Sequence, residues 1–190
     1  MNNKSNSKVI TASKEKRLFI ATFVNILLTV AQIIGGLISG SLSLISDALH
    51  NFSDAASLLL ALLAVKIGQK KPDLSKTFGY QRAETVAALI NFTTLIIIGL
   101  FLMYEAVIRL IYPKPISGWM VVIIAIIALI VDIITAMLTY KESKKSMNIK
   151  AAFLHNLTDA LASVGVVVAG TLILLYNWLW VDAAVTFLIS

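Results

Sequence analysis

LSLISDALHNFSDAASLLLALLAVKI, residues 42–67, is an apolar stretch that carries one histidine and two aspartates in its first half. A helix that crosses a hydrocarbon core of about 30 Å needs about 20 apolar residues, so this stretch is long enough to span a bilayer. The whole chain has the same character: 58% of its 190 residues are hydrophobic, 14% are charged, and its mean hydropathy is +0.88. This composition is too apolar for an ordinary soluble domain and predicts an all-α integral membrane protein.

The apolar segments predict a six-helix transmembrane bundle. The helices are expected near 17–40, 42–67, 82–111, 118–141, 148–177 and 180–190, after a basic N-terminal tail at 1–16. The intervals between them hold no separate soluble domain, so 17–190 is expected to form one transmembrane domain. A helix over 180–190 would rise only about 16 Å, about half the hydrocarbon thickness, and the sixth helix is therefore expected to be truncated.

Basic residues are distributed unevenly between the two sides of this bundle. Fourteen of the sixteen lie on one side, in the tail, in the intervals after the second and fourth helices, or at the helix ends next to them, whereas only Arg109 and Lys114 lie on the opposite side. Because cytoplasmic loops are enriched in basic residues, we expect the N-terminus in the cytoplasm. Aromatic rings at the predicted outer ends agree with this orientation: Tyr112, Trp119, Tyr176, Trp178 and Trp180. The same alternation leaves no single basic face, so the net charge of +6 does not indicate a nucleic-acid partner.

The only two histidines of the chain stand in matching frames, HNFSD at 50–54 and HNLTD at 155–159. On a helix, residues four apart lie on one face, so each frame pairs an imidazole with a carboxylate. The predicted topology makes the two helices antiparallel, and opposite ligand types can then face each other. For the two frames to reach one depth, the fifth helix must begin near Ser146, with Lys150 extending towards water.

Two imidazoles and two carboxylates are the first shell that suits a tetrahedral divalent ion, so His50, Asp54, His155 and Asp159 are the candidate metal ligands. The chain has no cysteine, which disfavours a copper(I) site. Zinc is the expected ion, with cadmium or cobalt as alternatives, and it would be a transported substrate. No organic cofactor is expected.

Metal and protons would compete for the same ligand atoms, which is the basis of metal/proton exchange. Asp47 and Asp132 are further acids inside apolar segments and are candidates for the ion pathway or a proton relay. Four other interpretations stay open: polar bonds that only join helices, proton conduction without metal, an intramembrane metal-dependent enzyme, and a non-functional truncated fragment of a transporter.

Several motifs resemble those of the cation diffusion facilitator family of zinc and heavy-metal exporters. They are GG at 35–36, GSLSL at 40–44, SDALH at 46–50, FGYQRAE at 78–84 and NIKAAFLH at 148–155. The resemblance implies a homodimer in the cell membrane that exports zinc from the cytoplasm in exchange for protons by alternating access. It also implies that the two His/Asp frames hold the transport ligands, in agreement with the interpretation from spacing.

The chain departs from the family pattern at two places. Relatives often place a zinc-binding histidine just before the FGY motif, where this chain has Lys76, so we expect no second metal site there. Relatives also complete the sixth helix and continue into a cytoplasmic domain, which is absent from these 190 residues. Activity of this chain by itself is therefore a separate question from the activity of the family.

Overall fold

The computed structural model of the protein describes residues 24–70, 77, 79–80, 82–143 and 147–190. These ranges contain helices and no strand, which confirms the prediction of an all-helical fold. The helices are the first one, described over Val24–Ser39, then α2 (Leu42–Gly68), α3 (Ala83–Ile111), α4 (Gly118–Ser143), α5 (Met147–Tyr176) and α6 (Trp180–Ile189). Four of them, α2 to α5, contain segments long and apolar enough to cross a membrane.

The helix limits bear on two expectations from the sequence. Helix α5 begins at Met147 and the side chain of Lys150 is exposed, as the matching depth of the two His/Asp frames requires. Helix α6 has ten residues and is shorter than a membrane span. The basic tail at 1–16 and Lys76 lie outside the described residues.

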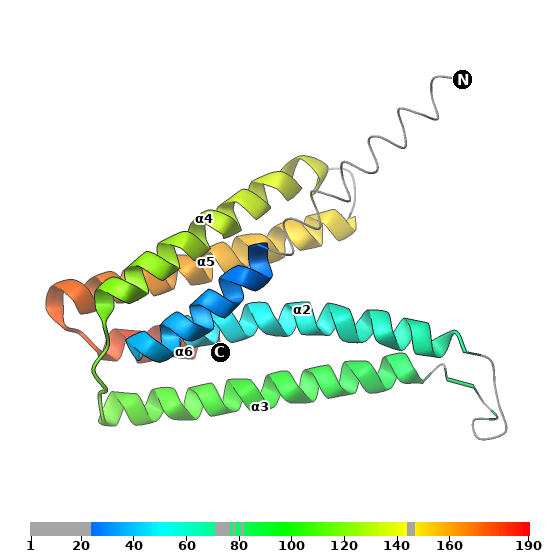
Figure 1. Ribbon diagram of the computed structural model, residues 1–190, viewed down its shortest axis with the longest axis horizontal. Helices are drawn as coiled ribbons and strands as arrows, with labels where there is room; N and C mark the ends of the chain where they lie inside the picture. Colours follow the sequence, from blue (N-terminus) through cyan, green and yellow to red (C-terminus); the bar gives the residue numbers. More distant parts are fainter. Residues whose placement is uncertain (1–23, 71–76, 78, 81, 144–146) are drawn as a thin grey trace.

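The four long helices form two antiparallel pairs, and the two shorter helices, the first helix and α6, lie against them (Figure 1). Helices α4 and α5 pack closely along their length, and α2 and α3 form the second pair. Helix α6 contacts α2, α3 and α5, while α2 also contacts α5 directly. The start of α2 therefore lies where the two pairs meet.

The buried core surrounds the first turns of α2. Leu44 on α2 is fully buried against Val121 and Ala125 of α4 and Val166 of α5. A second cluster joins residues of α2, α3 and α6: Leu42, Leu102, Ala106 and Ala183. These two clusters fix the position of α2 relative to four other helices, because close-packed interiors tolerate little displacement.

A sharp turn at Gly40 separates the first helix from α2. Gly40 has a φ of +75°, and a Cβ atom there would lie 2.8 Å from the carbonyl oxygen of Pro115, so only glycine fits without strain. The Arg109 guanidinium donates to the Gly40 carbonyl, and the Ser117 backbone N–H donates to the Ser39 carbonyl at 2.9 Å. The turn is thereby held against α3 and the start of α4.

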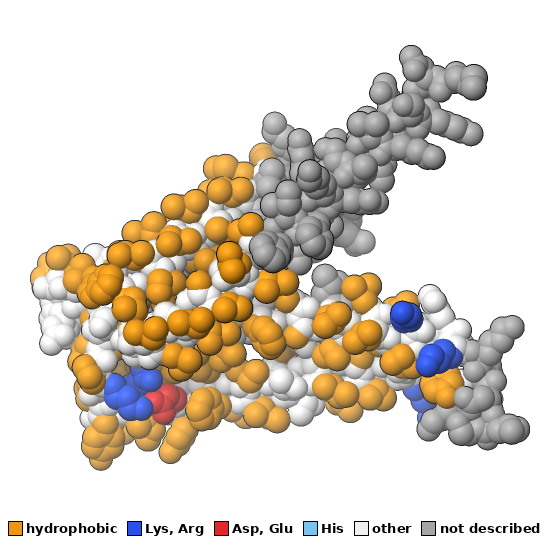
Figure 2. Space-filling view, viewed as in Figure 1, with side chains coloured by type: hydrophobic (Ala, Val, Ile, Leu, Met, Phe, Trp, Pro, Cys, Tyr) orange, Lys and Arg blue, Asp and Glu red, His pale blue; other side chains and the backbone are white. Residues whose placement is uncertain are grey.

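The outer surface of the bundle is apolar between charged ends (Figure 2). Many large hydrophobic side chains of α3 are exposed, among them Leu89, Ile97 and Phe101, as expected for helices in contact with lipid. At one end Glu105 accepts from Arg109 Nε at 3.1 Å and from Lys114 Nζ at 2.7 Å. This surface fits the multi-pass membrane protein that the composition predicts.

Candidate metal centre

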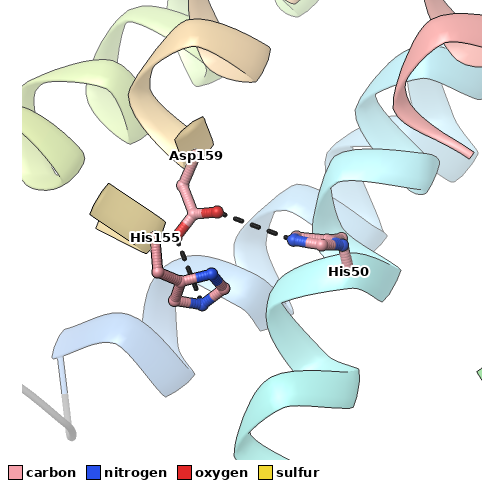
Figure 3. A group of neighbouring side chains, drawn as sticks. All are labelled: His50, His155 and Asp159. Carbon is pink, nitrogen blue, oxygen red and sulfur yellow. Dashed lines mark ion pairs between the residues drawn. The ribbon is translucent and has the colours of Figure 1, made fainter. Parts of the chain in front are cut away.

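The two His/Asp frames meet where α2 contacts α5. His50 and Asp54 lie one turn apart on α2, and His155 and Asp159 lie one turn apart on α5. Figure 3 shows both histidines and Asp159 pointing into the space between the two helices. Neither frame is interrupted by a helix break, so each pair shares one helix face as the spacing predicts.

Each carboxylate lies close to both imidazoles. Nε2 of His155 is 3.0 Å from Asp54 Oδ2 and 3.7 Å from Asp159 Oδ2. Nε2 of His50 is 3.5 Å from Asp159 Oδ1 and 3.7 Å from Asp54 Oδ2. The two cross-helix contacts are therefore shorter than the contacts within each helix, and the four side chains form one group.

These distances match the spacing of ligands around a small dication. In a tetrahedral zinc site with metal–ligand bonds of about 2.0 Å, neighbouring ligand atoms lie about 3.3 Å apart. The four His–Asp distances, 3.0 to 3.7 Å, bracket that value. Ligand atoms of His50, His155 and Asp159 all lie within 4.8 Å of one another. Asp54 is outside this set of three, although its Oδ2 lies 3.0 Å from His155 Nε2 and 3.7 Å from His50 Nε2.

Two carboxylate oxygens of the group are buried and, within the described part of the chain, make no hydrogen bond of good geometry. Asp54 Oδ2 and Asp159 Oδ1 are buried atoms for which no donor is found among the described residues, although both face an imidazole nitrogen. Buried polar atoms are usually satisfied, because leaving one unpaired costs about 1 to 3 kcal/mol. A divalent cation between the four side chains would satisfy both oxygens, so the donor set fits the metal that the sequence predicts.

The group is accessible from one side of the bundle. A cavity of about 310 Å³ is lined by His50 and Asp159 together with residues of α5 and α6, including Gly165, Val185 and Leu188. The side chain of Asp159 is 11% exposed, whereas those of His50 and His155 are 40% and 47% exposed. The imidazoles are therefore more exposed than the carboxylate of Asp159, which also lines the cavity.

Asp47 and Asp132, the predicted pathway residues, lie outside the group of candidate metal ligands. Both are buried, and each accepts a hydrogen bond from another helix. Gln32 Nε2 donates to Asp47 Oδ2 at 2.6 Å, and Ser163 Oγ donates to Asp132 Oδ2 at 2.7 Å. The first interaction joins the first helix to α2, and the second joins α4 to α5.

Asp182 in α6 is a polar residue that the sequence analysis overlooked. Its side chain is fully buried and accepts four hydrogen bonds from the start of α2. The signal was available, because Asp182 is the only charged residue in the apolar segment 180–190. The spacing of residues along the chain indicates no partner for Asp182, because the serines that bind it, Ser41 and Ser43, lie about 140 residues earlier.

Membrane-length helices that bring two imidazoles and two carboxylates together define a multi-pass membrane protein with a candidate cation site between two of its helices. The chain belongs to the cation efflux family, since the family model described as the cation efflux transmembrane domain matches residues 18–190. This confirms the resemblance inferred from the motifs. It is a family of transporters rather than enzymes, which removes the metal-dependent enzyme from the interpretations left open by the sequence.

Three curated relatives illustrate the similarity. The zinc transporter ZitB of Pectobacterium atrosepticum is 42% identical over 94% of this chain and 56% of its own length. A cadmium, cobalt and zinc/H(+)-K(+) antiporter of Bacillus velezensis is 39% identical over 92% of this chain and 57% of its own length. The metal cation efflux system protein CzcD of Cupriavidus metallidurans is 35% identical over 93% of this chain and 56% of its own length. The chain thus spans about half the length of the curated relatives it matches.

Proposed function

We propose that this chain is the membrane part of a divalent cation exporter that moves zinc out of the cytoplasm in exchange for protons. His50, Asp54, His155 and Asp159 are the proposed ligands of the transported ion. The observation that carries the proposal is the pair of cross-helix contacts, His50 to Asp159 at 3.5 Å and His155 to Asp54 at 3.0 Å. Each helix supplies one nitrogen and one oxygen, so movement of α2 against α5 would assemble or open the site.

Charge balance makes this ligand set suitable for transport. A dication with two carboxylates and two neutral imidazoles has no net charge, which lowers the cost of holding it within a membrane protein. When the ion leaves, the same four groups can take up protons in its place. Because metal and protons exclude each other at these atoms, a proton gradient can drive metal export.

Zinc is the proposed principal substrate, with cadmium and cobalt as further substrates. Nitrogen and oxygen ligands in a set of four favour these ions over magnesium and calcium, which require more oxygen ligands. Two of the relatives agree in their names: one is called a zinc transporter and another a cadmium, cobalt and zinc antiporter. The latter name also includes protons, which supports exchange.

The proposed setting is the plasma membrane, with the N-terminus in the cytoplasm and the protein acting as a homodimer. The orientation rests on the excess of basic residues on one side of the helices. The dimer and the location rest on the family resemblance. With this orientation the basic loop after α2 faces the cytoplasm, where zinc would be collected.

Asp47 and Asp132 are proposed as residues of the proton pathway. Both acids are buried and neither belongs to the candidate ligand set: Asp47 precedes His50 by three residues on α2, and Asp132 is bonded to Ser163, which follows Asp159 by four residues on α5. Their hydrogen bonds to Gln32 and Ser163 would hold them in place during proton transfer. On this proposal, Asp132→Asn slows proton-driven zinc flux while zinc binding is retained.

Zinc uptake into proteoliposomes with an internal pH reporter tests the proposed function. The chain as it stands should move zinc inward with counterflow of protons, and His50→Ala or Asp159→Ala should abolish both signals. Thr94→Val is the matched control, because the Thr94 hydroxyl is exposed on α3 and donates only to the Ile90 carbonyl of its own helix. Equal zinc movement by all four proteins would overturn the assignment of the site. Equilibrium zinc binding by the same proteins in detergent checks the site independently of flux.

A further inference from the structure

Asp182 holds the densest set of side-chain hydrogen bonds among the described residues. Its Oδ1 accepts from Ser41 Oγ and Ser43 Oγ, both at 2.6 Å, and from the Ser43 backbone N–H at 3.3 Å. Its Oδ2 accepts from the Leu42 backbone N–H at 2.7 Å. All donors belong to three consecutive residues at the start of α2, and the Asp182 side chain has no exposure to solvent.

This carboxylate caps α2 from a different helix. The first N–H groups of a helix have no partner within the helix, and the positive end of its dipole lies there. Ser41 satisfies one of them by accepting from the Leu44 N–H. Asp182 satisfies two more and brings a negative charge to the positive end. A buried carboxylate needs such donors, so the pairing stabilises both partners.

A second contact joins the other end of α6 to α2. Ser190 Oγ lies 3.2 Å from Ser46 Oγ, one turn beyond the capped end of α2. Helix α6 is therefore fastened to α2 near both of its ends, by Asp182 and by Ser190. Between these two points α6 presents Val185, Leu188 and Ile189 to the cavity beside the metal ligands.

The capped end of α2 is rigidly connected to the metal ligands. His50 follows Leu42 by eight residues of uninterrupted helix, a distance of about 12 Å along the axis. A shift of the α2 start against α6 would thus be transmitted to His50 and would also displace the cavity wall formed by α6. The position of His50 and the shape of the cavity beside it therefore both depend on the Asp182 carboxylate.

We infer that Asp182 is a positioning residue for the transport site, which it controls by holding α6 and α2 together as one unit. The inference rests on the proposed function for its effect on zinc. Asp182 touches none of the four ligands in the contacts that the described residues make, so its effect on the ion passes through the position of α2. A residue that only stabilises the fold would leave the zinc affinity of the folded protein unchanged.

Asp182→Asn tests the inference through zinc binding. The substituted amide presents an N–H group to a pocket of donors, so at least one hydrogen bond is lost and the negative charge disappears. We expect zinc affinity of the folded protein to fall on the order of tenfold, comparable with the loss of an outer-shell partner of a metal site. Thr171→Val on α5 is the control, since the Thr171 hydroxyl donates only to the Val167 carbonyl.

A disulfide reporter measures the contact between α6 and α2 without any metal. The chain has no cysteine, so Ser46→Cys with Ser190→Cys gives a single possible pair within one chain, and the short distance between the two hydroxyl oxygens places the two sulfur atoms close enough to react. Asp182→Asn should slow formation of this disulfide severalfold, whereas Thr171→Val should not. Ser43→Ala removes one donor and should give a smaller effect in the same direction, which keeps the test available if Asp182→Asn does not fold.

The two readouts separate failure of the inference from failure of the proposed function. An unchanged disulfide rate and an unchanged zinc affinity in Asp182→Asn would overturn the inference, even if the melting temperature fell. A parent protein that binds no zinc would contradict the proposed function, and the disulfide rate would then still decide whether Asp182 holds α6 against α2. Slower disulfide formation together with weaker zinc binding supports both.

Discussion

At the scale of single residues, the two histidines have distinct surroundings despite their matching sequence frames. His155 makes the shorter cross-helix contact, 3.0 Å to Asp54, whereas His50 is 3.5 Å from Asp159. Asp159 is the most buried of the four candidate ligands, and Asp54 is as exposed as His50. The candidate site therefore has an inner carboxylate and an outer one, and the outer one is the group whose role most needs a test.

Asp54→Ala should weaken zinc binding at least about 100-fold if Asp54 is a metal ligand, because loss of a ligand exceeds the 10- to 100-fold effect of losing an outer-shell partner. Isothermal titration of the detergent-solubilised protein measures the affinity, with Thr94→Val as the control. Retention of parental affinity would reduce the proposed shell to His50, His155 and Asp159.

Acidification should release the metal. Each ligand must be unprotonated to bind zinc, so zinc binding displaces protons and its affinity falls as the pH is lowered from neutral to mildly acidic values. Titrations in buffers of different ionisation enthalpy would measure the protons released per zinc ion. A zinc affinity that is independent of pH over this range would be incompatible with exchange at these residues.

At the scale of helices, the turn before α2 controls where the first His/Asp pair lies. Gly40 adopts a left-handed conformation and leaves no room for a Cβ atom beside the Pro115 carbonyl oxygen, while the Gly40 carbonyl accepts from Arg109. This turn and the Asp182 cap act on adjacent residues. The position of α2 is thus specified by contacts from α3, α6 and the loop before α4.

Gly40→Ala should destabilise the protein by about 1 to 2 kcal/mol from the backbone conformation alone, with a further cost from the contact with Pro115. Thermal unfolding in detergent measures the change. Gly165→Ala is a suitable control, because its added Cβ would meet only the Val185 side chain at an ordinary 3.5 Å and Gly165 has no positive φ. Equal melting temperatures for the two variants would contradict the role given to the turn.

At the scale of the whole molecule, most of the fold could be predicted because bilayer thickness imposes a length on each helix. Apolar stretches such as 42–67 predict α2 to within one residue at its C-terminal end. The His/Asp spacing, together with the predicted antiparallel course of α2 and α5, was also enough to predict that the four candidate ligands lie close together. Periodicity and length are local properties, and both are available in a single sequence.

Contacts between distant segments could not be predicted in the same way. The bond from Ser163 to Asp132 and the four bonds to Asp182 depend on how helices rotate and cross, which the hydrophobic pattern leaves open because the helices are apolar on all sides. The exclusion of Asp54 from the tightest set of three candidate ligands is another such feature, because spacing along a helix does not determine distances between side-chain atoms on two helices. Packing, rather than spacing, decides these details.

X-ray absorption spectroscopy at the zinc edge tests the ligand assignment, because it reports the atoms around the bound ion. With zinc bound to the purified protein, we expect four nitrogen or oxygen neighbours at about 2.0 Å, with outer-shell scattering from two imidazole rings. His155→Ala should remove one imidazole contribution. A six-coordinate shell of oxygen atoms, or a spectrum without imidazole scattering, would contradict the assignment of His50 and His155 as ligands.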